Sequence, residues 1–504
     1  GAAVLHSVVS ATWPAGRRLA AHAIVELPEP GTTDPATGEP TASQPNTERR
    51  VTLAAAGLDP SNQALLGALR ARGELGSAGL DNGEDTPELD GRLDLAGVLV
   101  AGPEGELEPD LTLFLRGNGF RSGPLALTGL EGQLALAGGA LVGPRVTGKL
   151  AGTEVVLRDA RFALEPDARD GDVFFSTAVD AEDLPLDRAH LLAFLEPEAL
   201  DALIDDFDWR GQVDLEAVDL KLARSDDGQL RVSLAGHLVP SAMRLVVGAP
   251  IEITRAEVEL EEFVYESGRA RAWGRTQGLF GGLAGREVRD ADLLFSYVDQ
   301  RLTIEDLDAA FAGGRLTSPG GGKGLALALD LASPHHLVLG VELQRVQAGE
   351  LLAGAFGGGQ NQGAIDASVR LEARPGDLLA ATGAGWVRID GAQLFSIPVF
   401  RELFRQLGFD ATAIFDSMRT TFSLADGVVS LREMHAHSPL LKLVGSGSWN
   451  LDGRIDADLE VRYSVVDKLG PLRFFVYWFQ DSILRVAIRG DVYRPVVLLR
   501  NSIM

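Results

Sequence analysis

The stretch "LKLVGSGSWNLDGRIDADLEVRY" spans residues 441–463 and alternates between two kinds of side chain. After the Asp452-Gly453 pair, apolar residues occupy every second position from Ile455 to Tyr463, and the positions between them carry charged side chains. A period of two that is broken by Asp-Gly predicts a β-hairpin with one apolar and one charged face. Because a buried leucine or valine contributes roughly 1.5–3 kcal/mol, something other than water must cover such a face.

The same alternation recurs along the chain. Apolar residues share one parity in 218–222 and 230–234, in 325–331 and 337–343, and in 365–371. Asp-Gly and Asn-Gly pairs separate many of these runs, as expected for tight turns. Helical spacing of apolar residues is confined to short segments, namely 59–73, 196–209 and 397–408. The sequence therefore predicts a mostly β protein, a long antiparallel sheet built of repeated hairpins with a few short helices.

Three covers are possible for the apolar face: a second sheet, the curl of the same sheet, or a molecule that is not protein. Few helices are predicted, and only 6% of the residues are aromatic, so few side chains could fill a wide interior. These features favour a sheet that is curled into an open trough. Strands of six or seven residues span roughly 20–23 Å, which suits an acyl tail, although a closed sandwich fits the same dimensions.

The residues expected to line this trough are the apolar members of the alternating runs. They are Val218, Leu220, Leu222, Leu230, Val232, Leu234, Leu325, Leu327, Leu329, Leu337, Leu339, Val341, Ile365, Val369, Leu371, Val387, Ile389, Leu441, Leu443, Ile455, Leu459 and Val461. A shift of one residue in register would place each of them on the opposite face.

Composition narrows the partners. The chain has 504 residues and a formal net charge of −25, which argues against nucleic acid because no basic patch is present to bind a polyanion. It has no cysteine, which weakly indicates an oxidising compartment. It contains no run of 18 apolar residues that would predict a membrane-spanning helix. Its first residues show neither an initiator methionine nor a signal-peptide pattern, so we expect a processed or excised portion of a longer chain.

Residues 302–463 resemble the C-terminal region of the AsmA family, which is grouped with TamB and YhdP among bridge-like lipid-transfer proteins. The similarity rests on Gly313-Gly314, on the strand glycines 383, 385 and 391, on Pro398 at the start of a short helix, on Asp426-Gly427, and on Gly445 and Gly447. The closing run "LRVAIRGDVYRPVVLL" (484–499) matches the strand, Gly490 and Pro495 with which the family tends to finish. The resemblance extends over about 290–500.

The resemblance implies a β-bridge with a hydrophobic groove that crosses the periplasm and moves phospholipid between the inner and outer membranes. It implies an inner-membrane anchor helix outside this chain, membrane at one or both ends, and possible membrane-protein partners there. Three segments are expected: 1–90, with N-terminal strands, a Pro/Thr-rich loop at 28–49 and a short helix; 91–290, a repetitive β-trough; and 291–504, the AsmA-like region, with a short helix near 397–408 and an aromatic cap.

The aromatic cap is "RFFVYWFQ" (473–480), and two interpretations of it stay open. It is either a packed end of the trough or a contact with a membrane interface, where amphipathic rings prefer to lie. Its candidate residues are Phe474, Phe475, Tyr477, Trp478 and Phe479. The helix at 397–408 is more often a plug of such a groove than a membrane anchor.

Motifs that could carry chemistry are incomplete. His435 and His437 have a spacing that can bind zinc, but no third ligand is near in sequence. "GSGSW" (445–449) is not a nucleophile elbow, "GGGKG" (320–324) lacks the Ser or Thr of a phosphate loop, and "DARDGD" (167–172) lacks the later Glu of a calcium loop. We therefore expect no catalytic residue, no metal and no cofactor.

The sequence thus predicts a non-enzymatic lipid conduit that carries phospholipid acyl chains along a hydrophobic groove. The alternative is a structural or adhesive β-solenoid or multi-sandwich protein without lipid cargo. A carbohydrate-active β-helix enzyme is a third reading, disfavoured because no carboxylate pair stands out among the 71 acidic residues.

Overall fold

The structure is a computed structural model, and it describes most of the chain. The described residues are 3–12, 18–27, 49–58, 88–91, 93–101, 107–122, 125–137, 139–163, 173–192, 194–225, 229–353, 362–375, 377–393, 398–406, 415–438, 441–463 and 484–501.

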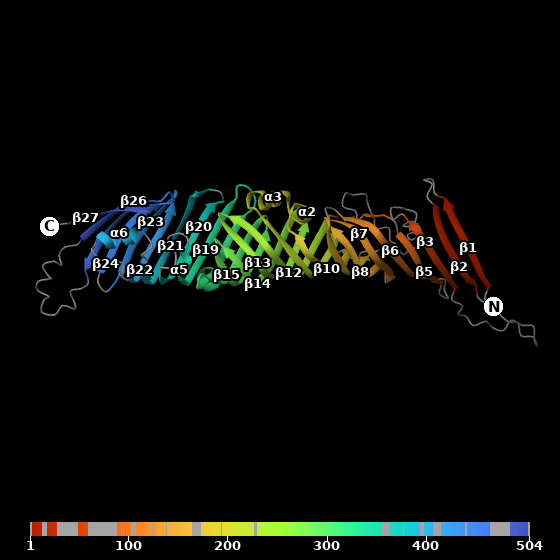
Figure 1. Ribbon diagram of the computed structural model, residues 1–504. Coiled ribbons are helices and arrows are strands. Elements are labelled where there is room, and N and C mark those ends of the chain that lie inside the picture. Colours follow the sequence, from red (N-terminus) through yellow and green to blue (C-terminus); the bar gives the residue numbers. More distant parts are fainter. Residues whose placement is uncertain are drawn as a thin grey trace, which may run out of the picture. The chain divides into compact units, whose positions relative to one another are not determined.

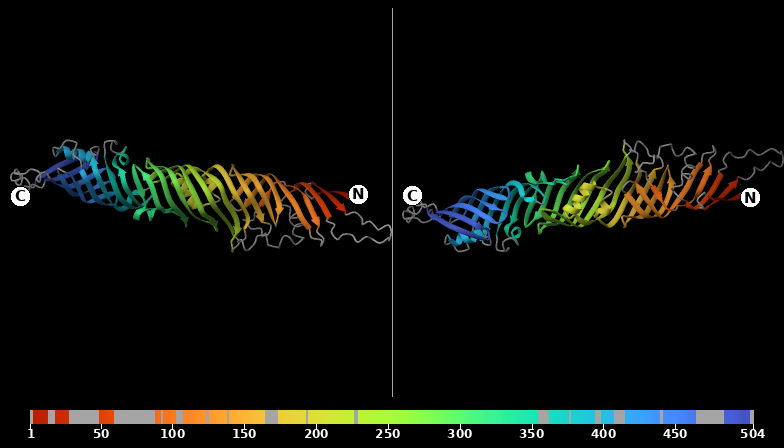
Figure 2. Two further views of the ribbon diagram at one scale, coloured as in Figure 1. Left: turned by 90° about the horizontal axis from the view of Figure 1, so that it is seen from below. Right: turned by 90° about the horizontal axis from the view of Figure 1, so that it is seen from above.

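The chain is mostly β, and its strands belong to one large antiparallel sheet with a few short helices, which confirms the predicted fold class. Most strands pair with the strands next to them in the sequence, so the sheet grows by adding one hairpin to another. Within each unit, Figures 1 and 2 show the strands following one another in the order of the colour bar.

The chain divides into two compact units. Unit 1 comprises residues 1–196, 212–239 and 260–270. Its strands are β1 (Ala3–Thr12), β2 (Arg18–Leu27), β3 (Arg49–Leu58), β4 (Glu88–Asp90), β5 (Leu93–Ala101), β6 (Leu107–Ser122), β7 (Leu125–Ala137), β8 (Ala140–Leu150), β9 (Thr153–Ala163) and β10 (Val173–Pro185). It also holds helix α2 (Arg188–Leu191).

Unit 2 comprises residues 197–211, 240–259 and 271–504. Its strands are β15 (Arg286–Val298), β16 (Arg301–Phe311), β17 (Gly314–Thr317), β18 (Leu325–Asp330), β19 (His336–Gln347), β20 (Gln362–Arg374), β21 (Asp377–Gln393), β22 (Phe415–Ala425), β23 (Val428–His437), β24 (Leu441–Asn450), β25 (Arg454–Tyr463), β26 (Leu484–Asp491) and β27 (Arg494–Asn501). Four strands contribute residues to both units: β11 (Arg210–Arg224), β12 (Leu230–Val247), β13 (Ala249–Glu266) and β14 (Arg269–Leu283).

The hairpin at 441–463 forms as its alternation predicts. Strands β24 and β25 are antiparallel, and Leu443 faces Val461 across the pair. On the opposite face, the guanidinium of Arg489 on β26 lies 2.9 Å from the carboxylate of Asp456 and 3.1 Å from that of Asp458. One face of this hairpin is therefore apolar and the other charged.

Two of the predicted helices are present. The segment 196–209 contains α3 (Pro197–Asp201) and a one-turn π-helix, η2 (Ala202–Asp206), and 397–408 contains α6 (Pro398–Gln406). The predicted helix at 59–73 lies outside the described residues. The structure adds α4 (Pro319–Gly322) and α5 (Ala348–Leu351), which are too short to show a helical period in the sequence.

Many strands carry a β-bulge in which one residue has a positive φ. An aspartate on the neighbouring strand accepts a hydrogen bond from the backbone N–H of that residue in four cases. The pairs are Ala217 with Asp180 (3.0 Å), Asp183 with Asp214 (2.7 Å), Gly278 with Asp292 (3.0 Å) and Arg345 with Asp366 (2.8 Å). A bulge bends its strand and increases the local twist, so these contacts hold bends in place within each unit.

The largest cluster of buried side chains lies in unit 1 and contains a group of three phenylalanines. The ring of Phe162 lies 4.5 Å from that of Phe175 and 5.7 Å from that of Phe120, measured between centroids. Leu222 and Val232, which pack in the same cluster, have no exposed surface. This part of the sheet therefore has a closed, close-packed core.

Candidate functional site

The strands β16 to β23 of unit 2 carry a row of apolar side chains on one face, which we call the apolar wall. Residues that face each other across antiparallel strands have side chains on the same side of the sheet. The pairings join Ile304 to Leu327, Leu327 to Leu339, Leu339 to Leu371, Val341 to Val369, Leu424 to Val429 and Phe422 to Leu431. All of these wall residues are half-buried.

Two glycines of β21 complete the wall. Gly383 faces Leu371 and Leu424, and Gly385 faces Val369 and Phe422. A Cβ at Gly385 would lie 2.6 Å from the ring of Phe422, and one at Gly383 would lie 2.5 Å from the side chain of Leu371. The neighbouring side chains therefore lie across the glycine strand, and the wall continues over β21.

Two helices cover other parts of the same face. Val399 and Leu403 of α6 pack in one cluster with Met418, Leu443 and Val461, and Leu403 has no exposed surface. A second cluster joins Ala348 of α5 to a further set: Val346, Ile365, Ala367, Phe311 and Leu316. Where these helices lie, the side chains of the sheet are almost fully buried.

The outer side of α6 carries a charged pair. Glu402 accepts hydrogen bonds from the Arg405 guanidinium, at 2.8 Å from Nε, and from the Gln406 amide at 2.9 Å. These contacts, with that to Arg405 the strongest, lower the pKa of Glu402 to about 2. The carboxylate therefore stays ionised at any pH at which the protein is expected to work.

The predicted lining residues fall into three groups. Those that are buried are Val218, Leu220, Leu222, Leu230, Val232, Leu329, Leu337, Ile365, Leu443, Leu459 and Val461. Those that are half-buried are Leu234, Leu325, Leu327, Leu339, Val341, Val369, Leu371, Val387, Ile389 and Ile455. The side chain of Leu441 lies outside the described residues.

Burial changes what these residues can contact. Leu222 and Val232 of unit 1, with no exposed surface, already have protein on every side, and so does Val461 under α6. Half-buried residues such as Val369 and Leu371 retain surface that a ligand could cover. Fewer of the predicted lining residues are therefore available to a ligand, and those that are belong mainly to the apolar wall.

Four further residues, Phe422, Leu424, Val429 and Leu431, belong to the wall although they are not among the predicted lining residues. The signal is present, because "FSLADGVVSL" (422–431) alternates apolar and small or polar residues around Asp426-Gly427.

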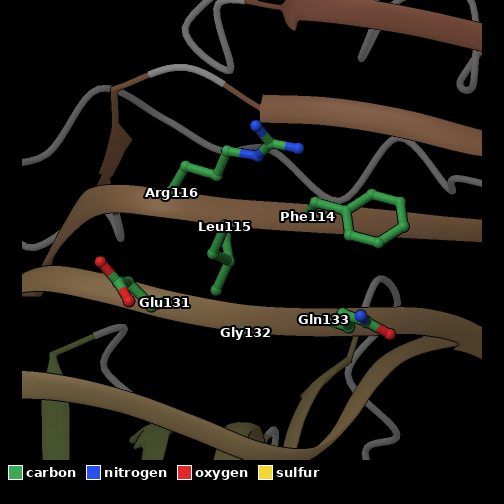
Figure 3. Close-up of a pocket in the computed structure, with 6 residues that line it drawn as sticks. All are labelled: Phe114, Leu115, Arg116, Glu131, Gly132 and Gln133. Atoms are coloured by element: carbon green, nitrogen blue, oxygen red, sulfur yellow. The ribbon is translucent and has the colours of Figure 1, made fainter.

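Unit 1 contains a shallow pocket of about 420 Å³ between β6 and β7. Figure 3 shows Leu115 extending from β6 toward β7, while Arg116 extends the other way. The lining residues are Phe114, Leu115, Arg116, Glu131, Gly132 and Gln133. Because its lining is as polar as it is apolar, this pocket does not suit an acyl chain.

A buried polar cluster in unit 1 has a structural role. The imidazole of His190 lies 2.7 Å from Asp187 through Nδ1 and 3.1 Å from the hydroxyl of Thr153 through Nε2. His190 is only 5% exposed, so the cluster attaches α2 to the first residue of β9 and leaves little of the ring accessible. The described residues contain no group of three His, Cys, Asp or Glu side chains that could hold a metal ion; His435 is half-buried and His437 exposed on β23.

Membrane proteins often have a spanning helix and aromatic residues at the bilayer interface. Among the described helices, none has the length and apolar character that a bilayer crossing requires. The aromatic run 473–480, with Phe474, Phe475, Tyr477, Trp478 and Phe479, lies outside the described residues. Its two interpretations stay open.

Comparisons with known proteins add no assignment to this geometry. A scan against models of protein families finds no match to the chain, and a search of curated proteins finds no similar sequence.

Proposed function

We propose that this protein is a non-enzymatic lipid-transfer protein that holds phospholipid acyl chains against the apolar wall of unit 2. The observation that carries the proposal is the contrast within one face of the sheet. Side chains under α5 and α6 are buried, whereas wall residues such as Leu339, Val369 and Leu371 are half-buried and in register across successive strands.

Physical chemistry supports an acyl ligand for this surface. The wall residues offer hydrocarbon without polar groups, and the glycines of β21 let neighbouring side chains lie flat across it. Large contiguous apolar surfaces on soluble proteins mark sites of interaction with other molecules. This surface offers no hydrogen bonds to a ligand. An acyl tail needs none, whereas a peptide or a sugar does.

The resemblance of residues 302–463 to the AsmA family supports the same function. On this proposal the protein acts in the periplasm, in outer-membrane biogenesis, anchored to the inner membrane in its full-length form and moving phospholipid between the two membranes. Membrane or membrane proteins would meet its ends. The charged outer face, with pairs such as Arg489–Asp456, would keep the conduit soluble.

A second candidate is a structural β-protein without cargo, and a specific observation favours it in unit 1. There the predicted lining residues Leu220, Leu222 and Val232 belong to a closed core with the three phenylalanines. In that reading unit 1 is a rigid scaffold, and its apolar face serves packing alone.

The test is to purify the chain without detergent, extract it with organic solvent, and identify bound lipid by mass spectrometry. We expect co-purifying phospholipid, and Val369→Asp should remove most of it, because a carboxylate in the wall repels hydrocarbon. Ser423→Asp is the matched control, because Ser423 is also half-buried and faces Ala384 and Ser430 on the other side of the same sheet. Absence of phospholipid from the wild-type extract would favour the scaffold.

A further inference from the structure

One edge of unit 2 carries exposed apolar side chains at or beside its hairpin turns, which we call the tip row. The row consists of Leu379 (63% exposed), Leu451 (44%) and Tyr493 (61%), with Trp449 (36%) beside it. Residues this large and apolar are unusual at such exposure when they recur in one place.

Direct contacts hold these turns side by side. Leu379 lies next to the turn at Gly427, where a Cβ would be 3.2 Å from its side chain. The N–H of Leu451 donates to the carbonyl of Gly427 at 2.8 Å, and the N–H of Val492 donates to that of Gly453 at 2.8 Å. Turns two strands apart are separated by roughly 10 Å, so the exposed side chains form a line.

The tip row continues the apolar wall. Trp449 faces Ile455 on β25 and Val429 on β23. Val429 is itself a wall residue. The apolar surface of the wall therefore extends through Val429 to Trp449, beside the tip row.

The same edge is polar further toward the N-terminus. The turns at Gln300 and Leu331 are also hydrogen-bonded to each other, at 2.8 Å, but their exposed residues are Asp299, Ser333 and Pro334. At these two described turns no large apolar side chain is exposed, in contrast to the turns beyond β20.

The chemistry of the tip row identifies its occupant. Tyrosine and tryptophan prefer the interface of a bilayer, where the ring meets hydrocarbon and its polar atom meets water. Acidic and basic side chains around these turns nearly balance: Asp377, Asp426, Asp452 and Asp491 with Arg374, Arg454 and Arg494. A near-neutral edge on a chain of net charge −25 suits a zwitterionic surface better than an anionic one.

We propose that the tip row inserts into the interface of a zwitterionic phospholipid bilayer and that acyl chains pass laterally between this interface and the apolar wall. The inference rests on the proposed function for the passage of lipid, whereas the insertion itself is tested separately. It assigns membrane contact to a lateral edge of the sheet, through Leu379, Leu451 and Tyr493.

The chain contains no cysteine, so single sites can be labelled cleanly. Leu451→Cys and Tyr493→Cys, each carrying an environment-sensitive NBD fluorophore, should shift to the blue and gain intensity with phosphatidylcholine vesicles. Ser333→Cys, at an exposed polar turn of the same edge, should not change. A smaller response is expected when a large fraction of phosphatidylglycerol is added. No response at either tip site with either vesicle would overturn the proposal and leave a protein partner as the occupant.

A second measurement uses vesicle co-sedimentation. The triple variant Leu379→Ser, Leu451→Ser, Tyr493→Ser should bind phosphatidylcholine vesicles at least about tenfold more weakly than the wild type. The control Phe280→Ser, Leu294→Ser removes two exposed apolar side chains (41% and 40%) elsewhere and should bind normally. Equal binding by the triple variant would contradict the tip row as the membrane contact.

The two proposals fail differently. If the tip probes stay in water while the purified chain carries phospholipid, the tip-row inference is wrong and the lipid-binding function stands. If the probes insert but no phospholipid is extracted from the chain, the protein contacts membranes without carrying lipid.

Discussion

Asp366 on β20 accepts a hydrogen bond of 2.8 Å from the backbone N–H of Arg345 on β19, at a bulge where Arg345 has a φ of 53°. The bulge shifts the register between Leu343 and Val346, so residues on both sides of it face the same side of the sheet. One carboxylate therefore keeps the apolar face continuous through a bend.

Replacing this carboxylate tests its role. We expect Asp366→Ala to lower the free energy of unfolding by about 1–2 kcal/mol, because the N–H of Arg345 loses its acceptor. Urea denaturation followed by circular dichroism measures the change. Glu372→Ala, an exposed position on the same strand, is the control and should change stability by less than about 0.5 kcal/mol. Equal effects of the two substitutions would show that the contact at the bulge is not stabilising.

Glycine 385 provides a second test. A Cβ there would meet the carbonyl oxygen of Ser368 at 2.2 Å and the Phe422 ring at 2.6 Å. We expect Gly385→Ala to destabilise the fold by about 1–3 kcal/mol, because backbone must move to make room. At Gly282, in strand β14, the nearest atoms are 3.7 Å away, so Gly282→Ala should be nearly neutral. Urea denaturation followed by circular dichroism measures both variants. A neutral Gly385→Ala would mean that Phe422 does not lie across β21.

Packing density should differ between the closed core and the apolar wall. Leu222 has no exposed surface, and we expect Leu222→Ala to cost about 2–5 kcal/mol. Leu371 is half-buried, so Leu371→Ala should cost about 1 kcal/mol, because less surface is lost and water can fill the space. Chemical denaturation compares the two directly. Similar losses at both sites would indicate that the wall is packed as tightly as the core.

A carboxylate introduced at a fully buried site should have a different effect from one introduced at a half-buried site. Leu459 is 2% exposed and packs in the cluster under α6, so Leu459→Glu should unfold that region. Val369→Asp places its carboxylate at a half-buried site and should leave the melting temperature within a few degrees of the wild type while reducing bound lipid. Melting curves and lipid extraction on the same samples separate the two effects. A folded Leu459→Glu variant would show that the cluster can open.

The pair on α6 predicts a pH dependence. The pKa of Glu402 falls from 4.5 to about 2, mainly through its hydrogen bond to Arg405. The ionised form is favoured in the folded state, so its contribution is complete above pH 4.5 and is lost as the pH falls toward 2. Arg405 is exposed to solvent, so screening keeps this contribution small. Glu402→Gln should therefore reduce the difference in stability between pH 5 and pH 2.5 relative to the wild type; an unchanged difference would contradict this origin.

The fold was predictable where the alternation is strong. The run at 441–463 determines two strands and their faces, because a period of two has a single physical reading beside an Asp-Gly turn. Bulges were not predictable, since Arg345 and Ala217 are not residues that favour a positive φ, and the aspartates that support them are distant in sequence. Burial also escaped prediction: Leu443 and Leu371 have the same pattern, and only the position of α6 makes one of them inaccessible.

The pairing of most strands with their chain neighbours has a kinetic consequence. Closing a hairpin requires only a short loop, so little chain entropy is lost before each new ladder forms. A nascent or translocating chain could therefore acquire native structure from whichever end emerges first, each finished ladder serving as the template for the next. Assembly of this kind would keep few strand edges uncovered at any moment, which protects an all-β chain of this length from aggregation before it is complete.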